Sequence, residues 1–104
     1  MAWFYLLIAG LLEIAWAFAM KQSHGFIYPI PTVLMVITMI GSIGFLAMAM
    51  RTLPLGTAYM IWTGIGAVGA FVVGVMILGE HLTPMRLIAV ALIVSGLMVM
   101  RLAE

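Results

Sequence analysis

Four apolar stretches, separated only by short polar connections, constrain the fold of this sequence more than any other feature. They cover about residues 2–20, 32–50, 57–78 and 85–100. A helix needs roughly 20 consecutive apolar residues to cross the hydrocarbon core of a bilayer. A soluble domain of 104 residues could not enclose a chain that is 67% hydrophobic and only 7% charged. The sequence therefore predicts an all-α integral membrane protein, with residues 1–104 forming a single domain of four transmembrane helices.

The connections between these stretches contain the residues that usually end helices. They are proline and glycine: Pro29 and Pro31 in the first connection, Pro54 and Gly56 in the second, and Gly79 and Pro84 in the third. Connections this short make neighbouring helices antiparallel, so we expect both termini on the same side of the membrane.

Charge and composition exclude several classes of function. The net charge is +1 with only four Lys and Arg residues, and without a cationic cluster a nucleic-acid partner is not expected. The chain has no cysteine, which excludes a disulfide framework and thiolate chemistry. His24 and His81 fall in separate connections, so no metal site is expected. Because the connections are too short to build a catalytic site, we expect neither an enzyme nor a bound cofactor.

The basic residues do not favour one orientation in the membrane. Arg51 and Arg101 share the side of the termini, whereas Lys21 and Arg86 share the other side. An excess of Lys and Arg on one side normally sets the topology, and here the two sides are equal. We therefore expect copies to insert both ways and to form an antiparallel homodimer, with the parallel homodimer as the alternative.

Glu13 is the one charged residue within the first apolar stretch. A charged side chain at the bilayer centre costs about 2.5 kcal/mol or more, and such residues usually mark ion or proton pathways. Gly10, Glu13 and Trp16 share a helix face at intervals of three, so that glycine leaves space beside the carboxylate and the indole lies beyond it. The alternative is a structural Glu13 that is hydrogen-bonded between helices.

Aromatic and hydroxyl residues in other stretches fit a site for an organic cation around this carboxylate. Tyr59 and Trp62 share a face of the third stretch, and with Trp16 they provide the electron-rich ring faces that attract such cations. Ser42, midway along the second stretch, is placed to donate a hydrogen bond to the carboxylate.

Small residues suggest two further features. Gly64 and Gly66 belong to a dense glycine cluster in the third stretch, where we expect a hinge. Ala89 and Gly96 are seven residues apart in the fourth stretch, and they predict a small-residue seam for packing between the two copies of a dimer.

Several of these motifs together resemble one known family. Residues 10–17 (GLLEIAWA), 53–59 (LPLGTAY) and 61–66 (IWTGIG) resemble the small multidrug resistance family, and the similarity extends over essentially the whole chain. Gly10 together with Trp16 is more similar to its guanidinium exporter subtype than to the subtype that exports polyaromatic cations.

The resemblance implies a four-helix antiparallel dimer in the bacterial inner membrane that exchanges protons for guanidinium ions by alternating access. Glu13 from each protomer would be the shared site for protons and substrate. The residues implied around it are Gly10, Trp16, Ser42, Tyr59 and Trp62.

One departure from the subtype concerns the second stretch. Ile43 and Gly44 stand where bulkier, often aromatic residues are expected, which would widen a lateral opening between the second helices of the dimer. Export of substituted guanidinium ions, or of quaternary ammonium ions as in a multidrug exporter, is therefore also considered. A third functional alternative is a non-transporting membrane subunit that scaffolds a larger complex. For the assembly, a heterodimer with a second, related chain is an alternative to the homodimer.

Overall fold

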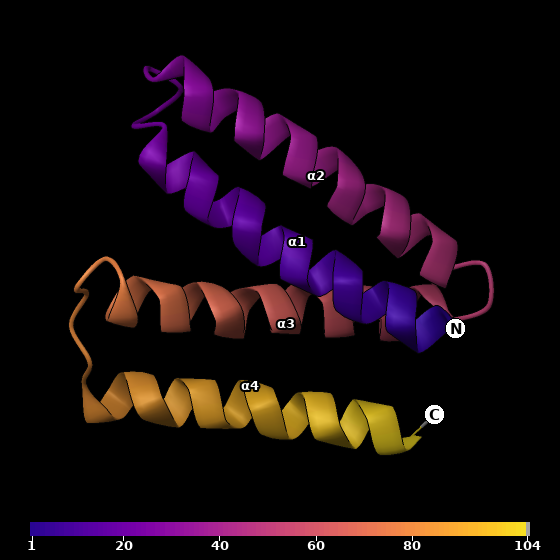
Figure 1. Ribbon diagram of the computed structural model, residues 1–104. Coiled ribbons are helices and arrows are strands. Elements are labelled where there is room, and N and C mark those ends of the chain that lie inside the picture. The colour runs from indigo at the N-terminus through magenta and orange to yellow at the C-terminus, as the bar shows by residue number, and fades with distance from the viewer. Residues whose placement is uncertain (104) are drawn as a thin grey trace.

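The chain is helical along almost its whole length in the computed structural model, which describes residues 1–103; residue 104, the end of the expected domain, lies outside this range. The helices in this range are α1 (Ala2–Gln22), α2 (Pro29–Ala49), α3 (Leu55–Met76) and α4 (Pro84–Ala103) (Figure 1). Each of these four is long and apolar enough to cross a membrane.

The helix boundaries follow from proline and glycine. Helix α2 begins at Pro29, three residues before the expected start at residue 32, because proline is tolerated in the first turn, where its missing N–H needs no partner. Helix α3 ends at Met76, two residues before the expected end. There the amide of Leu78 bonds back to the carbonyl of Val73 at 3.3 Å, and Gly79 turns the chain with φ +70°.

The four helices form two antiparallel hairpins. Helix α1 pairs with α2, α3 pairs with α4, and α1 crosses over α3 (Figure 1). Both termini lie at the end of the molecule that carries the α2–α3 connection, and the other two connections lie at the opposite end (Figure 1). The two ends therefore present different sets of loop residues.

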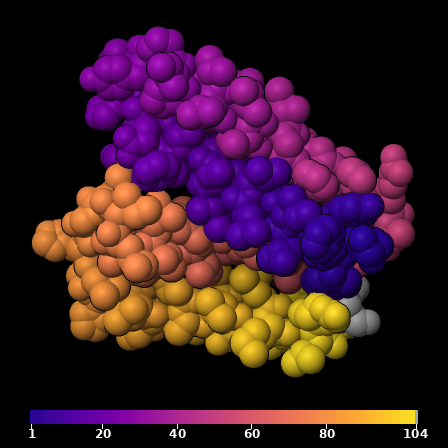
Figure 2. Space-filling model, viewed as in Figure 1, coloured from indigo at the N-terminus to yellow at the C-terminus, as the bar shows by residue number. Residues whose placement is uncertain are grey.

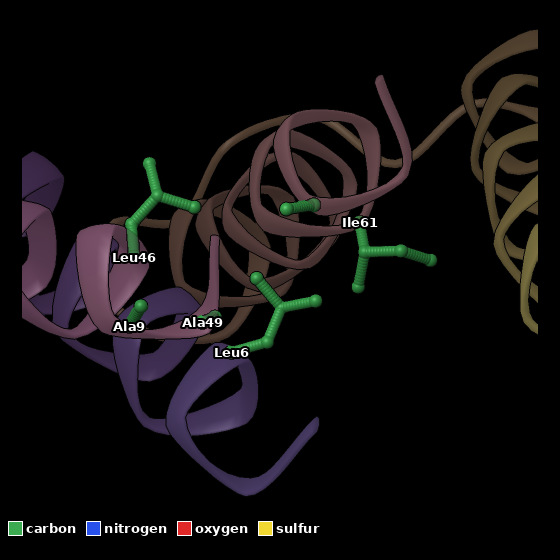
Figure 3. Close-up of a cluster of buried hydrophobic side chains, with 6 residues drawn as sticks. Leu6, Ala9, Leu46, Ala49 and Ile61 are labelled. Atoms are coloured by element: carbon green, nitrogen blue, oxygen red, sulfur yellow. The ribbon is translucent and has the colours of Figure 1, made fainter. Parts of the chain in front are cut away.

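The buried core lies where α1, α2 and α3 meet. It consists of Leu6, Ala9, Leu46, Ala49, Ala58 and Ile61 (Figure 3). Half of these residues are alanine, and small side chains allow helix backbones to approach closely. The core therefore holds α1 tightly against both of its neighbours.

Helix α4 lies at the edge of the chain. None of its residues is buried, and its backbone approaches only that of α3. Near its end the guanidinium of Arg101 stacks over the ring of Trp3 in α1, 4.5 Å from the ring centroid. Most of the apolar surface of α4 is therefore available to lipid or to another protein chain.

Candidate functional site

The carboxylate of Glu13 lies against helix α3 at Gly66. A Cβ atom at Gly66 would collide with the Cγ, Cδ and Oε1 atoms of Glu13. Gly66 therefore provides the space that the carboxylate occupies, and a side chain at this position would displace it. In this structure Gly66 lies within a continuous helix from Leu55 to Met76, and the hinge expected at Gly64 and Gly66 stays a prediction.

Two polar atoms on α1 are buried without a hydrogen-bond partner among residues 1–103. They are Oε1 of Glu13 and Nε1 of Trp16. Buried polar atoms nearly always have partners, because leaving one unsatisfied costs about 1–3 kcal/mol. The two atoms are an acceptor and a donor, three residues apart on one helix. In this arrangement the described residues therefore leave one acceptor and one donor of α1 unsatisfied.

Ser42 connects three helices instead of contacting Glu13. Its hydroxyl donates a hydrogen bond of 2.6 Å to the carbonyl oxygen of Ala9, and it accepts one of 2.9 Å from Nε1 of Trp62. The hydroxyl has one proton, so it does not donate to the Glu13 carboxylate as the sequence suggested. The reason is the close packing of α2 on α1, which brings Ser42 onto the backbone of Ala9, one turn before Glu13.

The two aromatic residues of α3 contact each other edge to face. The ring centroids of Tyr59 and Trp62 are 5.4 Å apart at an interplanar angle of 60°. Trp62 is partly buried and bonded to Ser42, whereas Tyr59 is 52% exposed and lines a groove between α3 and α4 with a volume of about 410 Å³. Every residue that lines this groove belongs to α3 or α4, so within one chain α1 and its Glu13 do not contribute to the groove that contains Tyr59.

Gly10 provides space for a different residue than the sequence suggested. A Cβ atom at this position would meet the side chain of Ile65 in α3, with Cβ of Ile65 at 2.8 Å. Gly10 therefore lets α3 approach α1 one turn before Glu13, and the space beside it is filled by isoleucine. It positions the helix pair, while Gly66 directly accommodates the carboxylate.

Two residues that shape the site were not predicted from the sequence. Ala9 provides the carbonyl that orients Ser42, and Gly69 provides the space for the side chain of Ile14. Gly69 follows Gly66 by three residues, so both lie on the face of α3 toward α1. This spacing within the glycine cluster was the available signal, whereas no sequence signal identifies a backbone carbonyl as an acceptor.

The small-residue positions on α4 are open in the single chain. Ala89 and Gly96 are exposed, and a Cβ atom at Gly96 would have no atom within 4 Å among the described residues. Gly64, by contrast, faces α4, where a Cβ atom would collide with Leu97. Packing of a second copy on Ala89 and Gly96 therefore stays a prediction.

These features define a class of protein: a multi-pass membrane protein that carries an ionisable residue among its helices, an arrangement typical of ion and proton pathways. Comparison with known proteins agrees. The family model described as Small Multidrug Resistance protein matches residues 1–93, and the chain belongs to this family. The family and the names of its relatives indicate a membrane transporter.

The relatives found by comparison cover nearly the full length of the chain. Proteins named "Guanidinium exporter" from Citrobacter freundii, Salmonella typhimurium and Escherichia coli (strain K12) are each 52% identical over 103 residues. The aligned region covers 99% of this chain and 98% of each relative. The resemblance to the guanidinium exporter subtype is therefore confirmed.

Proposed function

We propose that this protein is a proton-coupled antiporter that exports guanidinium and substituted guanidinium ions across the bacterial inner membrane. The observation that carries the proposal is the buried Oε1 atom of Glu13, which has no partner among residues 1–103. The names of the relatives supply the substrate class. Guanidinium is planar and permanently charged, and its paired N–H groups fit the two oxygens of a carboxylate.

Proton coupling follows from the cost of a charged carboxylate among apolar helices. The charge of Glu13 is neutralised either by a proton or by a bound cation, and the two exclude each other at one carboxylate. If the protein changes its open side only when Glu13 is neutralised, each outward cation is exchanged for inward protons. Alternating access at this one residue is therefore sufficient to drive export by an inward proton gradient.

The functional unit that we propose is an antiparallel homodimer. Two observations support it: Lys and Arg are equally divided between the two ends of the chain, and α4 has no buried residue. In such a dimer, Glu13 and Trp16 from both copies surround one central site. The outward-open and inward-open conformations of the dimer are then equivalent by symmetry. Trp62, held by Ser42, and Tyr59 complete the walls, and Gly64 with Gly66 serves as the hinge.

A second candidate is the export of quaternary ammonium ions. Gly44 on α2 has no atom within 4 Å of the position that a Cβ would take, and its neighbour Ile43 is 50% exposed. A small residue here favours a wide opening for alkyl substituents. Quaternary ammonium ions have no N–H groups, however, so they would leave the carboxylate without hydrogen-bond donors.

The test is electrical recording of proton-coupled currents from purified protein in proteoliposomes. We expect currents with guanidinium and with short alkylguanidinium ions, weaker or no currents with tetraalkylammonium ions, and none with the Glu13→Gln variant. Strong tetraalkylammonium currents would favour the second candidate. If no cation gives a current, the chain is better described as a non-transporting scaffold subunit.

A further inference from the structure

A second polar groove lies between the ends of α1 and α3, outside the Glu13 site. Its volume is about 340 Å³, and it is lined by Lys21 from the last turn of α1 and by Glu80 from the connection after α3. Figure 2 shows the surface indented where the violet end of α1 faces the orange end of α3. The groove therefore has a charged residue of opposite sign on each wall.

The inner end of this groove adjoins the candidate site. Its lining includes Ile14 and Ala67, which directly follow Glu13 and Gly66 in the sequence. Lys21 is seven residues beyond Ile14 on α1, a rise of about 10 Å along the helix. The groove thus extends from the loops at one end of the molecule to the level of the candidate site, while Glu13 and Gly66 themselves do not line it.

The structure holds the carboxylate of Glu80 over the end of α3. The amide of Glu80 donates a hydrogen bond of 2.9 Å to the carbonyl of Gly74, and Gly79, with φ +70°, turns the chain back. A Cβ atom at Gly74 would lie 2.5 Å from Oε1 and 2.9 Å from Cδ of Glu80. The absence of a side chain at Gly74 therefore allows the carboxylate to rest on the helix.

This placement makes the groove attractive to cations. The last carbonyls of a helix carry partial negative charge, so a carboxylate at the end of α3 adds to a charge of the same sign. Lys21 lines the same groove from α1. Arg86, the other basic residue of this end, donates to the carbonyl of His81 at 2.8 Å and does not line the groove.

We propose that Glu80 is an outer binding site for the exported cation and that the ammonium of Lys21 competes with the cation for this carboxylate. The proposal rests on the proposed function. An ammonium is a compact charge on a flexible chain, whereas guanidinium binds a carboxylate through two parallel hydrogen bonds. Guanidinium therefore binds the Glu80 carboxylate more strongly than the Lys21 ammonium does, and it is held in a groove whose lining begins one residue after Glu13.

The experiment measures guanidinium-driven currents in proteoliposomes at low ionic strength, over concentrations below and above half-saturation. Glu80→Gln is expected to raise the apparent KM roughly two- to five-fold, the range that a partly exposed charge pair supports. Lys21→Gln is expected to lower the KM, and the double variant is expected to behave like Glu80→Gln alone. Maximal currents at saturating guanidinium stay unchanged, which shows that each variant is folded and that the Glu13 site works.

Arg86→Gln is the matched control for Lys21→Gln, because it removes the same charge from the same end at a residue that does not line the groove. An unchanged KM in Glu80→Gln overturns the proposal. The proposal is also overturned if Arg86→Gln lowers the KM as much as Lys21→Gln does, because the KM then responds to the total surface charge and not to the groove. Failure of the proposed function gives a different result: the unmodified protein then produces no guanidinium current at any concentration.

Discussion

The indole of Trp62 is bonded to the hydroxyl of Ser42 at 2.9 Å, and this bond fixes an aromatic ring of α3 against α2. The same hydroxyl donates to the carbonyl of Ala9 at 2.6 Å. One serine therefore connects three helices within one turn of Glu13, and it orients the ring rather than the carboxylate.

The first prediction concerns this connection. Ser42→Ala removes the acceptor of the Trp62 indole, and a net hydrogen bond contributes about 0.5–1.5 kcal/mol, so guanidinium affinity should fall roughly two- to ten-fold. Trp62→Phe removes the donor of the same hydrogen bond, so guanidinium affinity should fall by a similar factor. Calorimetric titration of both single variants and the double variant provides the test. Because the two residues share one hydrogen bond, the affinity lost in the double variant should be smaller than the sum of the two single losses. Strict additivity of the losses would contradict this role.

The second prediction concerns the space that the carboxylate occupies. Gly66→Ala places a methyl group where the Glu13 side chain lies, so Glu13 must move and guanidinium currents should be largely lost. Gly56→Ala on the same helix is the control, because no atom lies within 4 Å of its added Cβ. Equal currents from the two variants would show that the contact between Gly66 and Glu13 has no role in transport.

A third prediction addresses assembly through α4. Gly96→Leu adds a large side chain at a position that is open within the single chain. If Ala89 and Gly96 form the seam between copies, this variant should weaken the dimer, as measured by single-molecule photobleaching in liposomes. Ala91→Leu, also exposed on α4 but on another face, should leave the dimer intact. An unchanged dimer in Gly96→Leu would place the interface elsewhere.

A fourth prediction addresses orientation in the membrane. The chain has no cysteine, so single cysteines can be introduced without a background. His24→Cys and Thr52→Cys lie in connections at opposite ends, and with no Lys and Arg bias each should be labelled on roughly half of the copies by an impermeant maleimide. Labelling of only one of these positions from outside the cell would show a single topology and would favour the parallel homodimer.

The sequence predicts the helices well because their lengths are imposed by the membrane. The four apolar stretches locate α1 to α4, and errors arise only at ends such as Pro29, where a proline permits an additional turn. The importance of Glu13 as a candidate residue also follows from the sequence, since any carboxylate within an apolar helix is exceptional.

Contacts between helices are not predictable in the same way. The partner of Ser42 proved to be the backbone of Ala9, and the space beside Gly10 is filled by Ile65. Both depend on the rotation and separation of packed helices, which hydropathy does not specify. Periodicity shows which residues share a face, but not which face meets which neighbour.

If protons and guanidinium share the carboxylate of Glu13, guanidinium that binds to the protonated protein must release protons. Guanidinium is added to purified protein in weakly buffered detergent solution, and the pH is recorded. We expect acidification that saturates with guanidinium binding and is absent in Glu13→Gln. Guanidinium binding without proton release, or proton release that persists in Glu13→Gln, would contradict it.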